Sequence, residues 1–148
     1  MKLLLDAMCG GLRAYLRLCG HDAAYAPDRG VEADDAIATL ARDEARAVVT
    51  RDRDLAATSD GILLRERDPV DQLRELAAAG VDLEPIDEPE RCGRCNGPLD
   101  RVPDDEPTPE YAPDPGDTPV WQCRDCEQCF WNGSHFERMV ETLAAVRR

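Results

Sequence analysis

Two Cys-x-x-Cys pairs in the C-terminal part constrain this chain more than any other feature. The pairs are Cys92 with Cys95 and Cys123 with Cys126, and 27 residues separate them. Two residues between cysteines let both thiolates reach one tetrahedral Zn²⁺ at about 2.3 Å. Four thiolates leave no coordination position open, so the spacing predicts a structural zinc in a module too small to bury a core of its own. Chance pairs of free thiols are disfavoured by this spacing.

A further cysteine leaves the ligand set open from spacing alone. Cys123, Cys126 and Cys129 form a Cys-x-x-Cys-x-x-Cys run, so Cys126 with Cys129 is an alternative second pair. Cys9 and Cys19 occupy apolar or tight positions, where packing is the default role. An odd count of seven cysteines with this spacing indicates metal binding in a reducing compartment and not a disulfide framework.

Short apolar runs alternate with helical periodicity through the first 90 residues. We expect strands at residues 2–5, 22–26, 47–50 and 61–64. We expect helices that open at Gly10-Gly11, at Asp34 or Asp35, and at Pro69. This alternation is typical of a mostly parallel sheet covered by helices on both faces. The sequence therefore predicts an α/β domain over residues 1–90, followed by a zinc module over residues 91–148.

The zinc module is expected to contain a long loop and a final helix. Residues 103–119 are crowded with Pro, Asp and Glu, which predicts a solvated, mobile loop. Asn132-Gly133 indicates a turn, and Ser134 with Glu137 forms a capping-box pattern that predicts the start of the helix. The apolar stripe of this helix is expected to pack on the ribbon or on the first domain.

Acidic residues follow two of the predicted strands at the point where each strand ends. Asp6 follows the first strand, and Asp52 and Asp54 follow the third. Because the carboxyl ends of parallel strands meet at one edge of the sheet, these carboxylates share a crevice if the two strands are neighbours. Clustered carboxylates repel one another and favour a hard cation such as Mg²⁺ or Mn²⁺, which can activate water for phosphodiester hydrolysis.

Each of these aspartates also has a structural interpretation. A strand-end aspartate is often only a turn former. The arginines that flank Asp52 and Asp54 can simply neutralise them. Asp34 and Asp35 stand at a predicted helix start, where aspartate is a routine N-cap, and from sequence alone that role outweighs metal binding.

The net charge of −13 limits how the chain can meet nucleic acid. Any RNA contact needs a local basic patch or bound cations, although high salt would screen the repulsion, with a Debye length of about 3 Å at 1 M. Lys2 is the only lysine, and this acidic, lysine-poor composition resembles proteins of salt-loving cytoplasms.

Nothing resembles a signal peptide or a membrane span, so we expect a cytoplasmic location and no membrane partner. A receiver-type phosphoacceptor would need a lysine beside its acids, and Lys2 lies at the wrong end of its strand.

Five short motifs occur in order along nearly the whole chain. They are Leu5-Asp6 before a glycine-containing loop, Tyr15-Leu16-Arg17-Leu18-Cys19-Gly20-His21-Asp22, Thr50-Arg51-Asp52-Arg53-Asp54-Leu55, Arg91-Cys92-Gly93-Arg94-Cys95-Asn96 and Trp131-Asn132-Gly133-Ser134-His135. In this order they resemble the Mut-seven C-terminal RNase family, PIN-like proteins that join an α/β nuclease domain to a zinc ribbon. The family's second knuckle lies five residues before the tryptophan, which favours Cys123 and Cys126 as ligands and gives Cys129 the place of an apolar residue.

The resemblance implies a three-layer PIN-like domain, a zinc ribbon ending in a helix, and a divalent-metal-dependent endoribonuclease. It implies that the catalytic Mg²⁺ or Mn²⁺ is held by Asp6, Asp34, Asp52 and Asp54. Arg17 and Arg51 are candidates to bind phosphates, although Arg17 can equally be the structural partner of an acid. Trp131 and His135 are candidates to contact RNA, since an exposed aromatic ring can stack on a base, although His135 can also be an exposed helix-start residue without a role. The alternative is a non-catalytic RNA- or ribosome-binding zinc-ribbon protein, whose RNA binding would survive loss of the carboxylates.

Overall fold

A four-stranded parallel sheet forms the centre of the first part of the chain in the computed structural model, which describes residues 1–148. Its strands, in the spatial order β2-β1-β3-β4, are β2 (Asp22–Tyr25), β1 (Lys2–Leu5), β3 (Ala47–Thr50) and β4 (Ile62–Leu63). Every neighbouring pair is parallel. The predicted α/β class with a parallel sheet is therefore confirmed.

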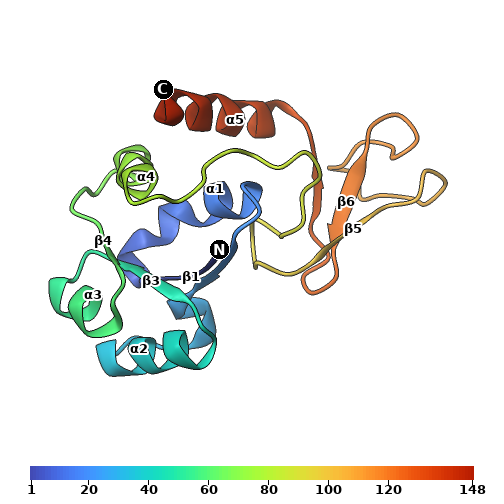
Figure 1. Cartoon of the computed structure of the whole chain (residues 1–148). Helices are drawn as coiled ribbons and strands as arrows, with labels where there is room; N and C mark the ends of the chain where they lie inside the picture. The colour runs from blue at the N-terminus through green and yellow to red at the C-terminus, as the bar shows by residue number, and fades with distance from the viewer.

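Helices cover both faces of this sheet, which gives three layers (Figure 1). The helices are α1 (Arg13–Leu18), α2 (Asp34–Asp43), α3 (Arg53–Ser59), α4 (Pro69–Ala78) and α5 (Ser134–Arg147). Helices α1, α4 and α5 lie over one face, and α2 and α3 lie over the other (Figure 1). No helix combines the length and the apolar character that crossing a membrane requires.

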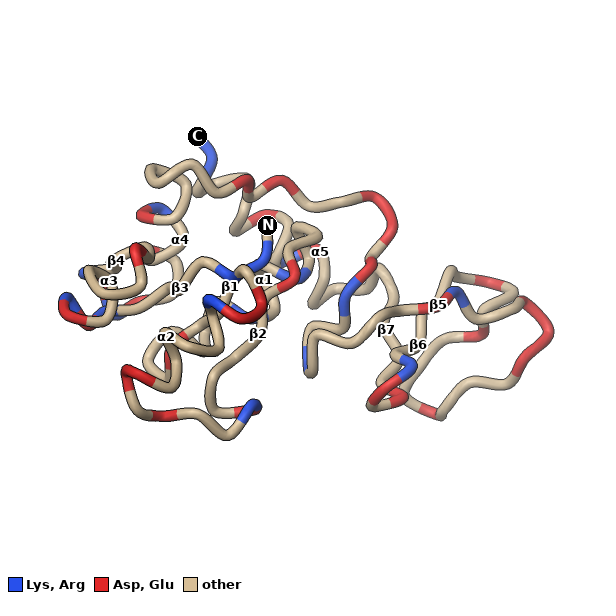
Figure 2. Tube along the Cα trace, turned by 60° about the horizontal axis from the view of Figure 1, so that its bottom comes forward, with Lys and Arg blue, Asp and Glu red and all other residues tan.

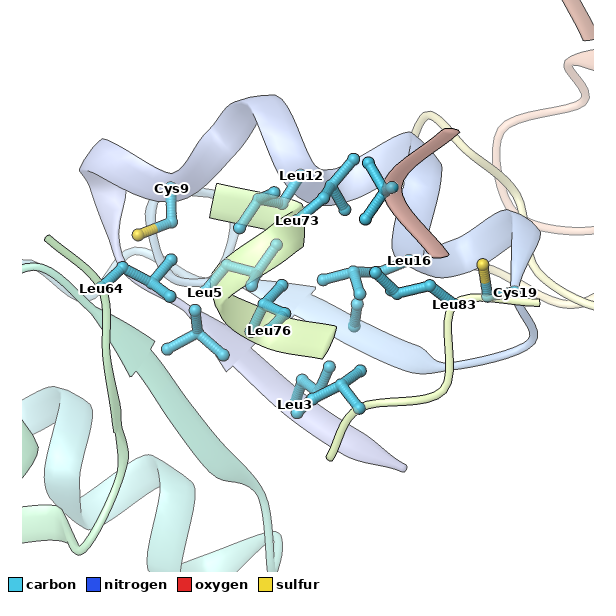
Figure 3. Packing of buried hydrophobic residues seen from close by; sticks show 14 of the residues in the cluster. Leu3, Leu5, Cys9, Leu12, Leu16, Cys19, Leu64, Leu73, Leu76 and Leu83 are labelled. Atoms are coloured by element: carbon cyan, nitrogen blue, oxygen red, sulfur yellow. The ribbon is translucent and has the colours of Figure 1, made fainter. Parts of the chain in front are cut away.

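Alternation along β1 directs successive leucines into the two cores. Leu3 and Leu5 point to the side of α1 and α4, where Figure 3 shows them beside Leu16 and Leu76. Leu4 points to the opposite side and joins the smaller core beneath α2 and α3. Because a central parallel strand is buried on both faces, its run of consecutive leucines is what such a position requires.

The zinc ribbon is a three-stranded antiparallel sheet of β5 (Leu99–Arg101), β6 (Val120–Cys123) and β7 (Cys129–Trp131). After β7 the chain returns to the first domain. Leu143 and Val146 of α5 are buried in the same core as the leucines of β1. The apolar stripe of α5 thus packs on the first domain, and the division of the chain at residue 90 stays a prediction.

Three local expectations differ from the structure. Helix α1 begins at Arg13, after a 3₁₀ segment over Ala7–Leu12, and not at Gly10-Gly11. A Cβ atom at Gly11 would lie 2.6 Å from Pro69 Cγ, so this glycine serves a close approach to the start of α4. Helix α5 is capped at Gly133 without a side-chain hydrogen bond, so the capping box predicted at Ser134 is wrong. Helix α3 was not anticipated, because its seven residues are too few to display a helical period.

The loop over residues 103–119 is acidic, but it is not simply solvated. The ring of Tyr111 lies 6.0 Å from that of Trp131, centroid to centroid. The Tyr111 hydroxyl accepts a hydrogen bond of 3.0 Å from the Cys129 N–H. Ala112 packs against the small ribbon core. Tyr111 thus holds the loop to β7. The average composition of the loop, on which the expectation of a solvated, mobile segment was based, does not indicate this contact.

Candidate functional site

The four predicted ligand cysteines come together at the end of the ribbon that contacts the first domain through Gly93 and Asn96. The Sγ atoms of Cys92, Cys95, Cys123 and Cys126 all lie within 4.8 Å of one another. Cys92 Sγ is 3.6 Å from Cys126 Sγ, and Cys95 Sγ is 3.5 Å from Cys123 Sγ. Thiolates bound to one tetrahedral Zn²⁺ at about 2.3 Å would be about 3.8 Å apart. The cluster therefore fits a structural zinc.

The surroundings of the sulfur atoms also fit bound thiolates. The N–H of Arg94 donates to Cys92 Sγ at 3.3 Å, and the N–H of Asp125 donates to Cys123 Sγ at 3.4 Å. Burial raises the pKa of the Cys92 thiol to about 12 when no cation is present. Deprotonation at neutral pH therefore depends on the positive charge of a bound ion.

Cys129 stands outside this group of sulfur atoms. Its side chain is buried beside Val102 and Val120 in the small core of the ribbon. The position is the apolar one that the family motif implies, and the four-cysteine group does not include it.

Thr50 joins two of the predicted acids at the carboxyl edge of the parallel sheet. Strands β1 and β3 are neighbours, and the Asp6 N–H donates to Val49 O at 3.0 Å. The fully buried Thr50 donates its hydroxyl to Asp6 Oδ2 at 2.7 Å and accepts the Asp52 N–H at 3.0 Å. The side chain of Asp6 and the backbone of Asp52 are thus held by one oxygen atom.

Asp34 faces the same edge from the start of α2. Ala33 is the N-cap residue, and no side chain caps the helix. The Asp34 carboxylate therefore does not act as the N-cap that the sequence favoured. The pKa of Asp34 is raised by desolvation, then by the charge of Asp52 and a hydrogen bond with it, and also by the charges of Asp6 and Asp54. The charges of the three other acids thus act on the Asp34 carboxyl and favour its protonated form.

Asp52 has a structural task as well. Its Oδ1 accepts the N–H groups of Asp54 and Leu55 at 2.8 and 3.2 Å and so caps α3. Asp54 lies in the exposed first turn of α3. The neighbouring Asp35 turns to its own helix, where it accepts the Ala36 N–H.

No arginine neutralises this group of acids. None of the salt bridges in the structure includes Asp6, Asp34, Asp52 or Asp54. Arg51 instead contacts Met8 Sδ through Nη1, and its Nε atom is buried without a partner. A set of oxygen ligands with unbalanced negative charge fits a hard divalent cation. The carboxylates are more loosely grouped than the thiolates, since only the cysteines bring three or more candidate ligand atoms within 4.8 Å.

Arg17 lies away from the solvent-exposed part of the site. Its side chain is 1% exposed, and it donates to Ala23 O through Nε and Nη2 and to Gly93 O through Nη1. A guanidinium buried in this way is not available to a phosphate. The geometry favours the structural alternative for Arg17, with backbone carbonyls in place of the expected acid.

Trp131 and His135 are close to each other but apart from the acids. Both line a cleft of about 480 Å³ where α1, the ribbon and α5 meet. The ribbon contacts Asp22 at the amino end of β2, whereas Asp6 and Asp52 follow the carboxyl ends of their strands. Figure 1 accordingly shows α3 and the ribbon on opposite sides of the sheet.

Two features of this arrangement were not identified from the sequence. The only sequence signal for the bridging role of Thr50 is its place in the Thr-Arg-Asp motif, two residues before Asp52. Arg91 and Arg94, which line the cleft, were considered only as neighbours of the first knuckle. A sequence signal was present, because Arg91 and Arg94 are basic residues beside the first knuckle in a chain of net charge −13.

Comparison with known proteins gives one family. A family model described as the Mut7-C RNAse domain matches residues 1–143. No curated protein and no solved structure matches the chain.

Proposed function

The chain belongs to the Mut7-C RNAse domain family, and we propose that it is a divalent-metal-dependent endoribonuclease that hydrolyses RNA phosphodiesters. The observation that carries this proposal is the group of acids at the carboxyl edge, where Thr50 joins Asp6 to Asp52 and Asp34 approaches from α2. Ligand sites of parallel α/β sheets lie at this edge.

In this proposal the acids bind Mg²⁺ or Mn²⁺, and each has its own position. Asp6 and Asp52 are the central ligands, because the Thr50 hydroxyl holds both the Asp6 carboxylate and the Asp52 backbone. Asp34 and Asp54 complete the group from the starts of α2 and α3. Such an ion, when bound, lowers the pKa of a water molecule and stabilises the leaving oxygen.

Arg51 is the proposed phosphate-binding residue of the acidic edge. It follows β3 directly, between Thr50 and Asp52, and no carboxylate pairs with its guanidinium. Its Nη1 atom contacts only the neutral Met8 Sδ, at 3.9 Å, so the positive charge of Arg51 remains available to a phosphate oxygen. Because Arg17 is buried, we do not include it in the RNA-binding surface.

The zinc ribbon has a structural and a binding role in this proposal. The ion would hold the two knuckles together, since the ribbon buries only a small core. Trp131 and His135 would then contact RNA away from the bond that is cleaved. RNA is the substrate that the family implies.

The test is RNA cleavage by the zinc-loaded protein across a Mn²⁺ titration. Asp6→Asn and Asp52→Asn keep the size of the side chain but remove one charge of the proposed site. Both variants are expected to lose cleavage, and their melting temperature should rise less with Mn²⁺ than that of the wild type. Asp43→Asn, at the other end of α2, is the matched control and should cleave normally.

Two outcomes would contradict the proposal in different ways. Unchanged cleavage by both variants would show that the active site lies elsewhere. RNA binding by the wild type without cleavage of any RNA would favour the non-catalytic RNA- or ribosome-binding protein.

A further inference from the structure

The cleft between the ribbon, α1 and α5 has walls that suit a flat aromatic ligand. Leu18 of α1 and Phe136 of α5 form two of its sides. The ribbon contributes three aromatic residues, Trp121, Phe130 and Trp131. A volume of about 480 Å³ is within the range of small-ligand pockets, roughly 300–1,000 Å³. The apolar part of this cleft can therefore accept a planar ring.

The charge of the cleft is opposite to that of the chain. Asp and Glu make up 31 of the 148 residues, yet none of them lines the cleft, whereas Arg91 and Arg94 do. Figure 2 shows basic residues on the trace just before β5, and acidic residues on the loop that follows β5. The cleft is thus the kind of local basic patch that an acidic protein needs to bind a polyanion.

The two arginines differ in how free their charges are. Arg91 Nη2 lies 3.5 Å from Asp22 Oδ2, so its charge is partly balanced. Arg94 is exposed and forms no salt bridge, and its side chain donates only to the neutral Gln128 Oε1, at 3.2 Å. Arg94 is therefore the cation of the cleft that remains available to an anion.

The first turn of α5 adds a second attraction for an anion. Gly133, Ser134 and His135 line the cleft, and no side chain caps this helix of 14 residues. The first N–H groups of a helix lack intrahelical partners and carry a partial positive charge. Beside Arg94, they offer hydrogen-bond donors that suit a phosphate.

We propose that this cleft binds one unpaired base of single-stranded RNA, stacked on its aromatic side chains, with the adjacent phosphate at Arg94 and the first turn of α5. A base within a duplex is stacked on its neighbours and would have to leave the helix before it could stack on these rings. The inference rests on the proposed function in taking RNA as the substrate. It deepens that function by assigning a second RNA contact, apart from the acidic edge, that requires a single-stranded segment.

The two tryptophans make the proposal directly measurable. Trp121 and Trp131 are the only tryptophans of the chain, and both line the cleft. The zinc-loaded protein, without added Mg²⁺ or Mn²⁺, is titrated with a short oligouridylate while tryptophan fluorescence is recorded. The fluorescence should be quenched over the same concentration range in which the anisotropy of a labelled oligouridylate rises.

Two variants and a control locate the contact. Arg94→Ala should weaken binding and lower the slope of log K against log salt by about 0.7, the value for one phosphate of a single strand. Phe136→Ala should weaken binding roughly 5- to 100-fold, as expected for a lost stacking partner. Arg138→Ala changes an exposed arginine of α5 outside the cleft and should leave both quantities unchanged. Zinc content, measured for each variant, verifies that the ribbon is intact.

The outcomes separate this inference from the proposed function. RNA binding without quenching, or equal salt slopes for Arg94→Ala and Arg138→Ala, would overturn the base-binding cleft even if Mn²⁺-dependent cleavage is present. Quenching by oligouridylate, together with no cleavage of any RNA in the separate Mn²⁺ titration, would support the cleft and overturn the nuclease. Quenching by a duplex as strong as that by the single strand would also contradict the proposal, because a paired base cannot stack in the cleft.

Discussion

Asn96 Nδ2 lies 2.7 Å from Asp22 Oδ1, and this hydrogen bond connects the zinc knuckle to the edge of the parallel sheet. The Asn96 Oδ1 atom also accepts the N–H of Ala23 at 3.1 Å, so the side chain pairs with the free edge of β2 as a neighbouring strand would. Asp22 binds Arg46 as well, at 2.8 Å. The pKa of Asp22 is lowered despite its burial, because Arg46 and Asn96 donate hydrogen bonds to the carboxylate.

Replacement of Asn96 tests this connection. Asn96 has a φ of 71°, which glycine adopts without strain, so Asn96→Gly removes the amide group alone. The variant should lose about 1–3 kcal/mol of unfolding free energy in urea, because the buried Ala23 N–H loses its acceptor. Glu127→Gly, at an exposed ribbon position with a φ of 65°, is the control and should be neutral or slightly stabilising. Equal stability of the two variants would show that the knuckle is not held through Asn96.

The fold was predictable from the sequence where the pattern is set by burial. The structure contains the predicted strands over Lys2–Leu5 and Ala47–Thr50. A strand that is buried on both faces needs a run of apolar residues, and such a run is visible in the sequence. Helix α3 and the packing of Tyr111 were missed. The first is too short to show a period, and the second depends on one aromatic residue in an acidic loop.

The zinc ligands could be predicted from the sequence, whereas the surroundings of Asp34 and Arg17 could not. The spacing of Cys92 and Cys95 points to one ion, because ligand geometry fixes a short separation along the chain. The approach of Asp34 to Asp52 depends on how α2 packs beside β3, which no local motif encodes. The buried environment of Arg17 likewise arises from a carbonyl 76 residues away, that of Gly93.

Zinc binding distinguishes the two possible pairs of the second knuckle. Elemental analysis should find about one zinc per chain, because the four thiolates fill a tetrahedral site. Cys95→Ser should lose the metal and unfold the ribbon, whereas Cys129→Ser should retain it, since Cys129 packs in the ribbon core. Loss of zinc from Cys129→Ser, with zinc retained by Cys123→Ser, would reverse the assignment of the ligands.

The acidic loop is expected to stabilise the ribbon through Tyr111. Tyr111→Phe removes the acceptor of the Cys129 N–H and should cost about 0.5–1.5 kcal/mol in thermal or urea unfolding. Deletion of residues 104–116 should cost more, because the contact between Tyr111 and Trp131 is lost as well. Glu110→Ala, beside Tyr111, is exposed and should have no effect. A deletion variant as stable as the wild type would show that the loop is dispensable for the ribbon.

Stability should fall as the pH decreases through the range in which histidine is protonated. His21 is 5% exposed, with Nδ1 facing the Met1 amino group and Nε2 facing Asp82 O. Burial, together with the positive amino group, lowers the pKa of His21 below its ordinary value. The unfolded chain therefore binds the proton more readily, and the stability present above about pH 6.5 is lost as the pH falls toward the folded-state pKa.

Urea unfolding between neutral pH and mildly acidic pH measures this effect. His21→Gln should show a smaller loss of stability across the range than the wild type. His135→Gln, at the only other histidine, which is exposed, should match the wild type. A slope shared by all three proteins would assign the pH dependence to other groups.

The hydroxyl of Thr50 is expected to position the acids, apart from any contact with RNA. Thr50→Val has nearly the same shape but cannot donate to Asp6 Oδ2 or accept the Asp52 N–H. Because residues that orient metal ligands typically affect metal affinity or activity 10- to 100-fold, cleavage should fall by about that factor, and half-maximal activity should need more Mn²⁺. Binding of RNA without divalent ions should stay the same, since the buried Thr50 cannot reach the cleft at α5.

Thr50→Ser separates orientation from packing. It retains the hydroxyl and loses a methyl group, so it should restore cleavage and its Mn²⁺ dependence even if the protein becomes somewhat less stable. A purely structural Thr50 would give the opposite order, with the well-packed Val variant active and the Ser variant impaired. The ratio of the two activities, measured at saturating and at limiting Mn²⁺, therefore decides whether the bond between Thr50 and Asp6 serves the proposed metal site or only the end of β3.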